Sequence, residues 1–177
     1  MKHNRQAQEE LYLRFSYMMK GVCLRYSSNE ADAEDLLQES FIKIFNNLRA
    51  YQETGKLGAW LRKITVNCAL EKYRKEKKKK ENTLLVADYG VHDFDFENAL
   101  SKLELDDLLA KIQQLPNGYR TIFNLYVIEG YQHKEIAELL NISEGTSKSQ
   151  YSRARILLKE MIEKEEKHKI NNLDYAK

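Results

Sequence analysis

The chain has 177 residues, 42% of them hydrophobic, and a formal net charge of +2. This length suits one ordinary domain or two small ones, and with so small a net charge a nucleic-acid-binding surface must gather its cations locally. No run approaches the roughly 20 apolar residues that cross a bilayer, and the N-terminus has no apolar signal-peptide core. We therefore expect a cytoplasmic protein that inserts no segment into a membrane.

The cysteines and histidines give no sign of a metal site. Cys23 and Cys68 stand far apart in stretches of helical pattern, and the four histidines are scattered at no ligand spacing. We expect both cysteines to be small core residues in a reducing compartment, and no metal or other cofactor. One proline, seven glycines and the lack of any long strand-like alternation favour an all-α fold.

The first half of the chain predicts three helices. Apolar residues recur at three-to-four spacing over residues 6–26, 32–48 and 59–80, which is the pattern of a helix with one buried face. The expected core residues are Leu11, Phe15, Met18 and Val22, then Leu37, Phe41, Ile44 and Leu48, then Trp60, Leu61, Ile64 and Cys68. We assign residues 5–80 to one small helical domain.

The composition changes sharply after this domain. Residues 72–81 carry seven basic and two acidic side chains, whereas residues 83–100 carry four acidic ones and neither lysine nor arginine. The acidic stretch has no helical period until its end, so we predict a flexible linker over residues 81–99. Helical patterns return in a second small domain, residues 100–165, and we expect the tail beyond it to fray.

The second domain begins with two expected helices. The first runs from Leu100 to Leu115, and Pro116 closes it or opens the next element. The second is short and apolar and ends at Gly130, a favourable C-cap residue. After it, residues 131–160 read YQHKEIAELLNISEGTSKSQYSRARILLKE, which predicts a short helix, a tight turn and a longer basic helix.

Helical phase separates two faces of that last helix. At about 100° per residue, one face holds Ser147, Tyr151, Ala154 and Leu158, which can pack on Ile136, Ala137 and Leu140 of the preceding helix. Ser143 is placed to cap the last helix. The other face holds Lys148, Ser149, Ser152 and Arg153. Short polar and cationic side chains suit base edges and phosphates in a DNA major groove, although a merely solvated helix face has the same pattern.

The second helix of the first domain combines an acidic face with apolar residues. Opposite its expected core stripe lie Asp35, Glu39, Ile42 and Asn46, with Gln38 and Phe45 on the flank. Apolar area on an acidic surface favours a protein-binding face. A solvated helix with stray hydrophobic residues is the alternative.

The third helix is strongly cationic. It carries Arg62, Lys63, Lys72, Arg74, Lys75 and Lys77–Lys80. Such a run is often only a solvated helix end, but beside the loop at residues 51–58 it can hold a nucleic-acid strand with salt-dependent affinity. An opened strand also needs a pocket or aromatic faces for its flipped bases. Tyr51, Leu57 and Trp60 are nearest to that loop, and we expect Trp60 to lie in the core.

The two domains together resemble a bacterial RNA polymerase sigma factor of the extracytoplasmic-function (ECF) type. DAEDLLQESFIKIFNNL and AWLRKITVNCALEKYRKEKK are similar to the family's region 2, and LPNGYRTIFNLYVIEGYQHKEIAELLNISEGTSKSQYSRARILLKE is similar to its region 4. The resemblance covers roughly residues 8–80 and 100–162. It implies a dissociable, non-enzymatic polymerase subunit that recognises and opens promoters.

The resemblance also implies a partner for each candidate site. The core polymerase would contact the chain through its β′ clamp helices, at Asp35, Gln38, Glu39, Ile42 and Phe45, and through its β flap. The promoter −10 element and the melted non-template strand would meet Lys56, Arg62, Lys63, Asn67 and Arg74. The double-stranded −35 element would meet Thr146, Lys148, Ser149, Ser152, Arg153 and Arg155, the last as a backbone clamp or a surface ion pair. An anti-sigma factor is the implied inhibitor, and Ser147 and Tyr151 depart from the family's usual aliphatic residues.

Two other classes of protein fit the sequence less well. An independent DNA-binding regulator would use the C-terminal hairpin alone, which leaves the acidic face of the second helix and the cationic third helix unexplained. A nuclease or another enzyme needs clustered carboxylates or histidines at metal spacing beside the basic helix, and the sequence offers none. Binding to core polymerase separates a sigma factor from an independent regulator.

Overall fold

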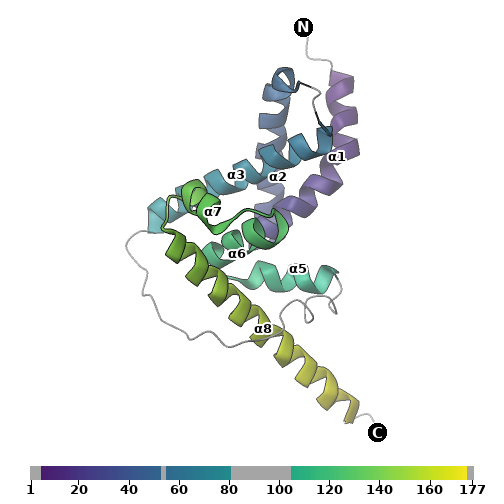
Figure 1. Cartoon of the computed structure of the whole chain (residues 1–177). Helices are drawn as coiled ribbons and strands as arrows, with labels where there is room; N and C mark the ends of the chain where they lie inside the picture. The colour runs from purple at the N-terminus through teal and green to yellow at the C-terminus, as the bar shows by residue number, and fades with distance from the viewer. Residues whose placement is uncertain (1–4, 53–54, 81–104, 175–177) are drawn as a thin grey trace. The chain divides into compact units, whose positions relative to one another are not determined.

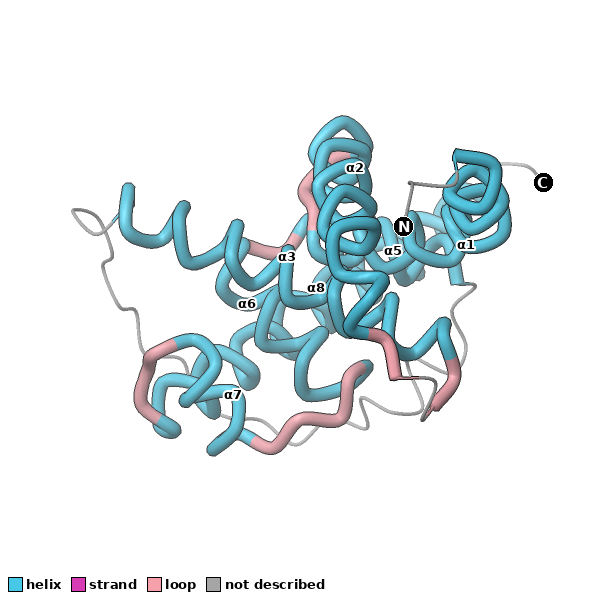
Figure 2. Tube along the Cα trace, turned by 90° about the horizontal axis from the view of Figure 1, so that it is seen from above, coloured by secondary structure: helices cyan, strands magenta, loops and turns pink. Residues whose placement is uncertain are grey.

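The computed structural model describes residues 5–52, 55–80 and 105–174 (Figure 1), and within these ranges all regular structure is helical (Figure 2). The chain divides into two compact units, Met1–Asn82 and Thr83–Lys177. The predicted all-α fold with two helical regions is confirmed. The linker expected over residues 81–99 lies outside the described residues.

Unit 1 is built from three helices that each pack against the other two. They are α1 (Arg5–Tyr26), α2 (Glu30–Asn47) and α3 (Leu57–Lys80), and the short 3-10 turn η1 (Leu48–Ala50) follows α2. The core is formed by the buried apolar side chains Met19, Val22, Cys23, Tyr26, Ala33, Leu36, Leu37, Phe41, Ile44, Leu61, Val66, Cys68, Ala69, Leu70 and Tyr73. Both cysteines are buried as expected, and burial raises the pKa of the Cys23 thiol to about 12.

The buried face of α1 differs from the predicted one. Val22 is buried, but Met18 is 46% exposed, and its neighbour Met19 is fully buried instead. The reason is that apolar residues occupy several sides of α1, so their spacing does not decide which side meets α2 and α3. Of the stripe predicted for α2, Leu48 is the exception, since it is half-buried in η1.

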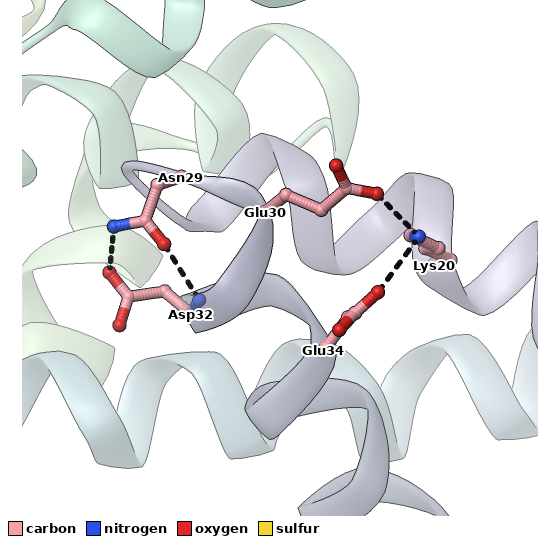
Figure 3. A network of polar contacts seen from close by, with 5 residues as sticks. All are labelled: Lys20, Asn29, Glu30, Asp32 and Glu34. Carbon is pink, nitrogen blue, oxygen red and sulfur yellow. Dashed lines mark hydrogen bonds and ion pairs between the residues drawn. The ribbon is translucent and has the colours of Figure 1, made fainter.

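A polar network fixes the junction of α1 and α2 (Figure 3). The Asn29 side chain caps α2, because its Oδ1 accepts from the Asp32 backbone N–H at 2.8 Å and its Nδ2 donates to Asp32 Oδ2 at 2.9 Å. From α1, Lys20 Nζ reaches Glu30 at 2.7 Å and Glu34 at 3.3 Å. The cap explains why α2 begins two residues earlier than predicted.

Unit 2 assembles around one long helix. Its elements are α5 (Leu105–Gln114), α6 (Asn117–Phe123), the π-helical turn η2 (Asn124–Ile128), α7 (His133–Leu140) and α8 (Glu144–Asp174). Helices α5, α6 and α7 all pack on α8. A buried cluster in this unit comprises Ile112, Leu115, Phe123, Ala154 and Leu158.

The residues at the helix ends of unit 2 agree in part with the sequence-based prediction. Pro116 is the residue before α6, and Gly130 takes the left-handed φ of +77° after η2, so both act as predicted. The single apolar helix expected before Gly130 is instead an α-helix followed by a π-helical turn. The tail also differs, because α8 continues to Asp174. No proline or glycine follows Gly145 to break it. The expected start of the first helix at Leu100 lies outside the described residues.

Candidate polymerase and nucleic-acid interfaces

One face of α2 presents carboxylates together with apolar side chains. Asp35, Gln38 and Glu39 are exposed, and Ile42 is 60% exposed. Their spacing of three, four and seven residues puts them on one side of the helix. Phe45 is half-buried, and its ring packs on Phe41 with 5.7 Å between ring centroids. We call these five predicted residues, Asp35, Gln38, Glu39, Ile42 and Phe45, the acidic–apolar face.

An open groove between α1 and α2 adjoins this face. It has a volume of about 310 Å³ and is lined by Tyr12, Ser16, Tyr17, Lys20, Glu34, Leu37 and Gln38. Tyr17 is 91% exposed, and Leu13 nearby in α1 is 71% exposed. Sequence reasoning missed this apolar surface, although its signal was present in the apolar residues that occupy more than one side of α1. The groove extends the acidic–apolar face because Gln38 belongs to both.

Some exposed polar and cationic residues of α3 share one side of the helix. Lys63, Asn67 and Arg74 are exposed, and their separations of four and seven residues keep them within about 40° of one another around the helix axis. The exposed Lys56 immediately precedes the helix. We call these four residues the cationic stripe. Arg62 does not belong to it, because it is half-buried and lies about 100° further round the helix.

An aromatic pair stands at the start of α3. Tyr51 and Trp60 lie with 5.3 Å between ring centroids at a tilt of 49°, and the Tyr51 hydroxyl donates to the Gly55 carbonyl at 2.5 Å. The prediction that Trp60 belongs to the core is wrong, since its side chain is half-buried. The Trp60 ring packs instead on Tyr51, the residue that follows η1, outside the three-helix core.

The α7–turn–α8 unit is closed by local hydrogen bonds. Glu135 accepts from the Gln132 backbone N–H at 2.7 Å at the start of α7, and Asn141 ends that helix in the left-handed conformation with φ 51°. Ser143 Oγ accepts from the Thr146 N–H at 2.9 Å. The predicted cap of the last helix is therefore confirmed, and the turn between the two helices is tight.

Burial separates the two predicted faces of α8 in part. On the inner face Ser147, Ala154 and Leu158 are fully buried, and Tyr151 is half-buried. On the other face Lys148 and Ser149 are exposed, whereas Thr146, Ser152 and Arg153 are half-buried like Tyr151. We call Thr146, Lys148, Ser149, Ser152 and Arg153 the reading face.

Local contacts already hold part of the reading face in place. Lys148 pairs with Glu144 one turn earlier at 2.7 Å, and the Thr146 hydroxyl lies 2.8 Å from Ser143 Oγ. Arg155 is set apart from this face, since its guanidinium lies over the Tyr151 ring at 5.8 Å from the centroid. The reading face therefore offers a DNA partner two cations, the exposed Lys148 and the half-buried Arg153.

Sequence reasoning missed a polar and aromatic cluster at the crossing of α7 and α8. The His133 Nδ1 lies 2.9 Å from the buried Ser147 Oγ, and the His133 ring stacks on Tyr126 at 4.3 Å with an 11° interplanar angle. Tyr151 closes the cluster at 5.6 Å from His133 and 4.6 Å from Tyr126. We call these four residues the His133 clasp. The available signal was Ser147, a polar residue on a predicted packed face, which needs a hydrogen-bond partner.

Burial lowers the pKa of His133 below its ordinary value. The charge of Lys148 acts in the same direction to a smaller extent, and the carboxylate of Glu144 opposes both. The imidazole is thus neutral at pH 7. A neutral ring has one nitrogen that donates and one that accepts, and the Ser147 hydroxyl suits either role.

Comparison with known proteins defines the class of this fold. Residues 11–79 match the family described as "Sigma-70 region 2", and residues 105–158 match "Sigma-70, region 4". The order of the two matches is that of a sigma-70-type polymerase subunit in which unit 1 supplies region 2 and unit 2 supplies region 4.

Individual relatives narrow the class. The ECF RNA polymerase sigma factor SigW of Bacillus subtilis is 30% identical over 151 residues, covering 80% of this chain and 81% of SigW. The ECF RNA polymerase sigma-E factor of Haemophilus influenzae is 29% identical over 163 residues, covering 86% of each chain. The chain belongs to the ECF family of RNA polymerase sigma factors, and its function is promoter-specific transcription initiation.

A solved structure supports the fold. The sigma factor RpoE from Bartonella quintana, solved in complex with the anti-sigma factor NepR, matches with a TM-score of 0.51 at 23% identity, over 88% of this chain and 96% of that one. Within residues 5–52, 55–80 and 105–174, no helix has the length and apolar character to cross a membrane. The same residues bring no three His, Cys, Asp or Glu side chains together as a metal site.

Proposed function

We propose that the two units divide the work of promoter recognition. Unit 1 binds core polymerase through the acidic–apolar face and holds the melted −10 region along α3. Unit 2 reads the double-stranded −35 element through the reading face of α8 and meets the β flap of the polymerase. The observation that carries this proposal is the separation of α8 into a buried inner face and a polar, cationic outer face.

The acidic–apolar face suits a protein partner. Its carboxylates at positions 35 and 39 share one side of α2 with Ile42, whose 60% exposure gives a partner apolar area to bury. The groove at Gln38 and the exposed ring of Tyr17 enlarge that area. Clustered apolar surface with a polar rim is typical of a binding site, and the β′ clamp helices are the partner that family membership favours.

The cationic stripe suits a nucleic-acid backbone. Lys63, Asn67 and Arg74 face solvent together, and each cation that neutralises a phosphate contributes salt-dependent affinity. The Tyr51–Trp60 pair stands where α3 begins, and aromatic faces are sequence-tolerant platforms for unpaired bases. Arg62 lies half-buried on another side of the same helix.

The reading face suits a DNA major groove. Lys148 and Arg153 provide the cations, and Ser149 and Ser152 provide short donors and acceptors on one side of α8. This is the arrangement by which the second helix of a helix-turn-helix contacts base edges. Arg155, held over Tyr151, would act on the DNA backbone rather than on bases.

Regulation by an anti-sigma factor is part of the proposal. The apolar surface of α1 and the exposed Ile42 offer a second protein the same area that the polymerase would use. An inhibitor bound there would compete with the polymerase directly. The protein would act in the cytoplasm, where it meets polymerase and DNA, and as a recognition subunit rather than as an enzyme.

Reconstitution with purified core polymerase tests the function. The chain should co-purify with core polymerase and direct transcripts from specific start points on a genomic DNA template. Core polymerase alone is the control. If the chain binds duplex DNA but neither associates with core polymerase nor changes its start points, it acts as an independent regulator and the proposal is wrong.

A further inference from the structure

The His133 clasp occupies the place where the orientation of α8 is decided. Ser147 lies in the first turns of α8, directly between Thr146 and Lys148 of the reading face, and it is completely buried. Its hydroxyl oxygen lies at hydrogen-bond distance, 2.9 Å, from His133 Nδ1. A change in this contact therefore acts on the same helical turn as the reading face.

The ring of His133 is itself held firmly. It is stacked on Tyr126 of η2 and flanked by Tyr151 of α8, so three elements of unit 2 meet at one imidazole. Hydrogen bonds have a narrow range of donor–acceptor distances. A fixed ring and a short hydrogen bond together leave Ser147, and with it the start of α8, little freedom to rotate.

Small rotations of α8 matter for base reading. The ends of side chains lie at a radius of about 5–6 Å from the helix axis, so a rotation of about 20° moves them by about 2 Å. That displacement is enough to break a hydrogen bond to a base edge. Contacts to phosphates by long side chains tolerate such a shift better, because a lysine or arginine can adjust its flexible stem.

We infer that His133 is a positioning residue for promoter reading: held by Tyr126, it fixes the rotation of α8 through Ser147 and so sets which −35 bases the reading face prefers. The inference rests on the proposed −35 role of α8. It assigns to His133 no contact with DNA. His133 affects the discrimination between promoter sequences and not the total electrostatic affinity for DNA.

Two substitutions remove the hydrogen bond from opposite sides. Ser147→Ala deletes the hydroxyl and keeps the stacked ring, and His133→Ala deletes the ring. His133→Asn is the conservative variant, since its amide places a polar atom near the position of Nδ1. Glu138→Ala, an exposed change on the same helix α7, is the matched control.

The readout uses the full chain assembled with core polymerase. Duplex promoters with a randomised −35 region are selected by wild-type holoenzyme, and the affinity ratio between the preferred sequence and its single-base variants is measured for each protein at several salt concentrations. Circular dichroism of each free variant reports its helix content. Retained helix content separates loss of positioning from loss of folding.

We expect Ser147→Ala and His133→Ala each to lower the discrimination ratio about fivefold or more, the low end of the effect of one good base contact. Their salt dependence should be unchanged, and the double variant should be no worse than His133→Ala alone, because both substitutions remove the same hydrogen bond. His133→Asn keeps a polar atom near Nδ1 but lacks the stacked ring, so it should recover part of the discrimination lost in His133→Ala. Glu138→Ala should match wild type.

Two results would overturn the inference. One is an unchanged discrimination ratio in Ser147→Ala. If His133→Ala loses helix content and cannot be interpreted, the result for Ser147→Ala is sufficient by itself. The other is a uniform weakening on all sequences, because that would give the clasp a purely structural role. If wild-type holoenzyme itself shows no base preference at −35, the proposed role of α8 fails, and the inference fails with it.

Discussion

Asn29 uses both ends of its amide at the start of α2. The oxygen accepts from the Asp32 N–H, and the nitrogen donates to the Asp32 carboxylate. Without the cap, one backbone N–H of the first turn has to be satisfied by water instead. The residue therefore contributes to the stability of unit 1 although it lies on its surface.

Replacing Asn29 with alanine should destabilise unit 1 by about 1 kcal/mol, the usual contribution of an N-cap side chain. Denaturant unfolding can be followed by the fluorescence of Trp60, the only tryptophan of the chain. Asn46→Ala, an exposed change in the last turn of α2, should be neutral or slightly stabilising because alanine favours helix. Equal effects of the two substitutions would contradict the assigned cap.

His133 should make the stability of unit 2 sensitive to acid. Its pKa is lowered by burial and by Lys148, with Glu144 acting against them, so as the pH falls the unfolded chain takes up a proton before the folded unit does. The free energy of unfolding is therefore unaffected by His133 above about pH 6.5, the ordinary histidine value, and decreases as the pH falls from there toward the lowered pKa.

Comparison with a variant that cannot titrate isolates this effect. Amide hydrogen exchange of α7 and α8 at about pH 7.5 and about pH 5.5 gives the local opening free energies. We expect the acid-induced loss to be larger in wild type than in His133→Asn. The same loss in both proteins would mean that the pKa of His133 does not change on folding.

The acidic–apolar face of α2 gives a prediction at the scale of an element. Asp35→Ala with Glu39→Ala removes two exposed carboxylates from one side of a helix. Binding to core polymerase should weaken about tenfold or more, since truncating charged residues at an interface centre costs more than about 1 kcal/mol. The helix content should not change.

Glu9→Ala with Glu10→Ala removes the same charge from exposed positions of α1 and is the matched control for core binding by fluorescence titration. It should bind like wild type. If the α2 double variant binds core polymerase as tightly as this control, the polymerase face lies elsewhere on unit 1.

The cationic stripe of α3 gives a second prediction for an element. Lys63→Ala with Arg74→Ala should reduce the salt dependence of holoenzyme binding to a promoter with a pre-melted −10 region. The slope of log affinity against log salt should fall by about one for each phosphate contact removed. Lys20→Ala, whose cation is paired with Glu30 and Glu34, should leave the slope unchanged, and an equal slope in the stripe variant would exclude the stripe as a strand contact.

Helical phase predicted some faces from the sequence and not others. The inner face of α8 was predictable because Ser147, Tyr151 and Ala154 keep one phase, and Ser143 marks the start of the helix. The buried side of α1 was not predictable, because apolar residues occupy several of its sides. The π-helical turn at Asn124–Ile128 was also missed, since so short an apolar stretch fits either helical period.

Helical phase likewise predicted some parts of the candidate sites and not others. The exposed positions of Asp35 and Glu39 on α2 could be predicted because they lie opposite an apolar stripe, whereas the half-buried position of Arg62 on α3 was missed. The His133 clasp could not be predicted from the sequence, because it depends on residues from η2, α7 and α8 that only packing brings together. A polar residue such as Ser147 on a packed face indicates that a partner exists, but not which residue it is.

The whole molecule divides into two compact units, and we propose that each carries a different main contact. Variants of the acidic–apolar face should therefore alter the affinity for core polymerase without altering base preference at −35. Variants of the reading face should alter promoter choice without altering assembly with the polymerase. This separation is what distinguishes a two-region sigma factor from a regulator that acts through its helix-turn-helix alone.

Promoter discrimination by holoenzymes carrying Arg153→Ala or Lys148→Ala shows whether α8 contacts the −35 element. Each variant is assembled with core polymerase, and binding and transcription are measured on promoters altered at every −35 base. A lost base contact should reduce discrimination at one position by about 1–3 kcal/mol, and a lost phosphate contact should weaken all sequences alike and lower the salt slope by about one. If neither substitution changes promoter affinity, base preference or salt dependence, α8 does not contact the −35 element, and the proposed division of promoter recognition between the two units is wrong.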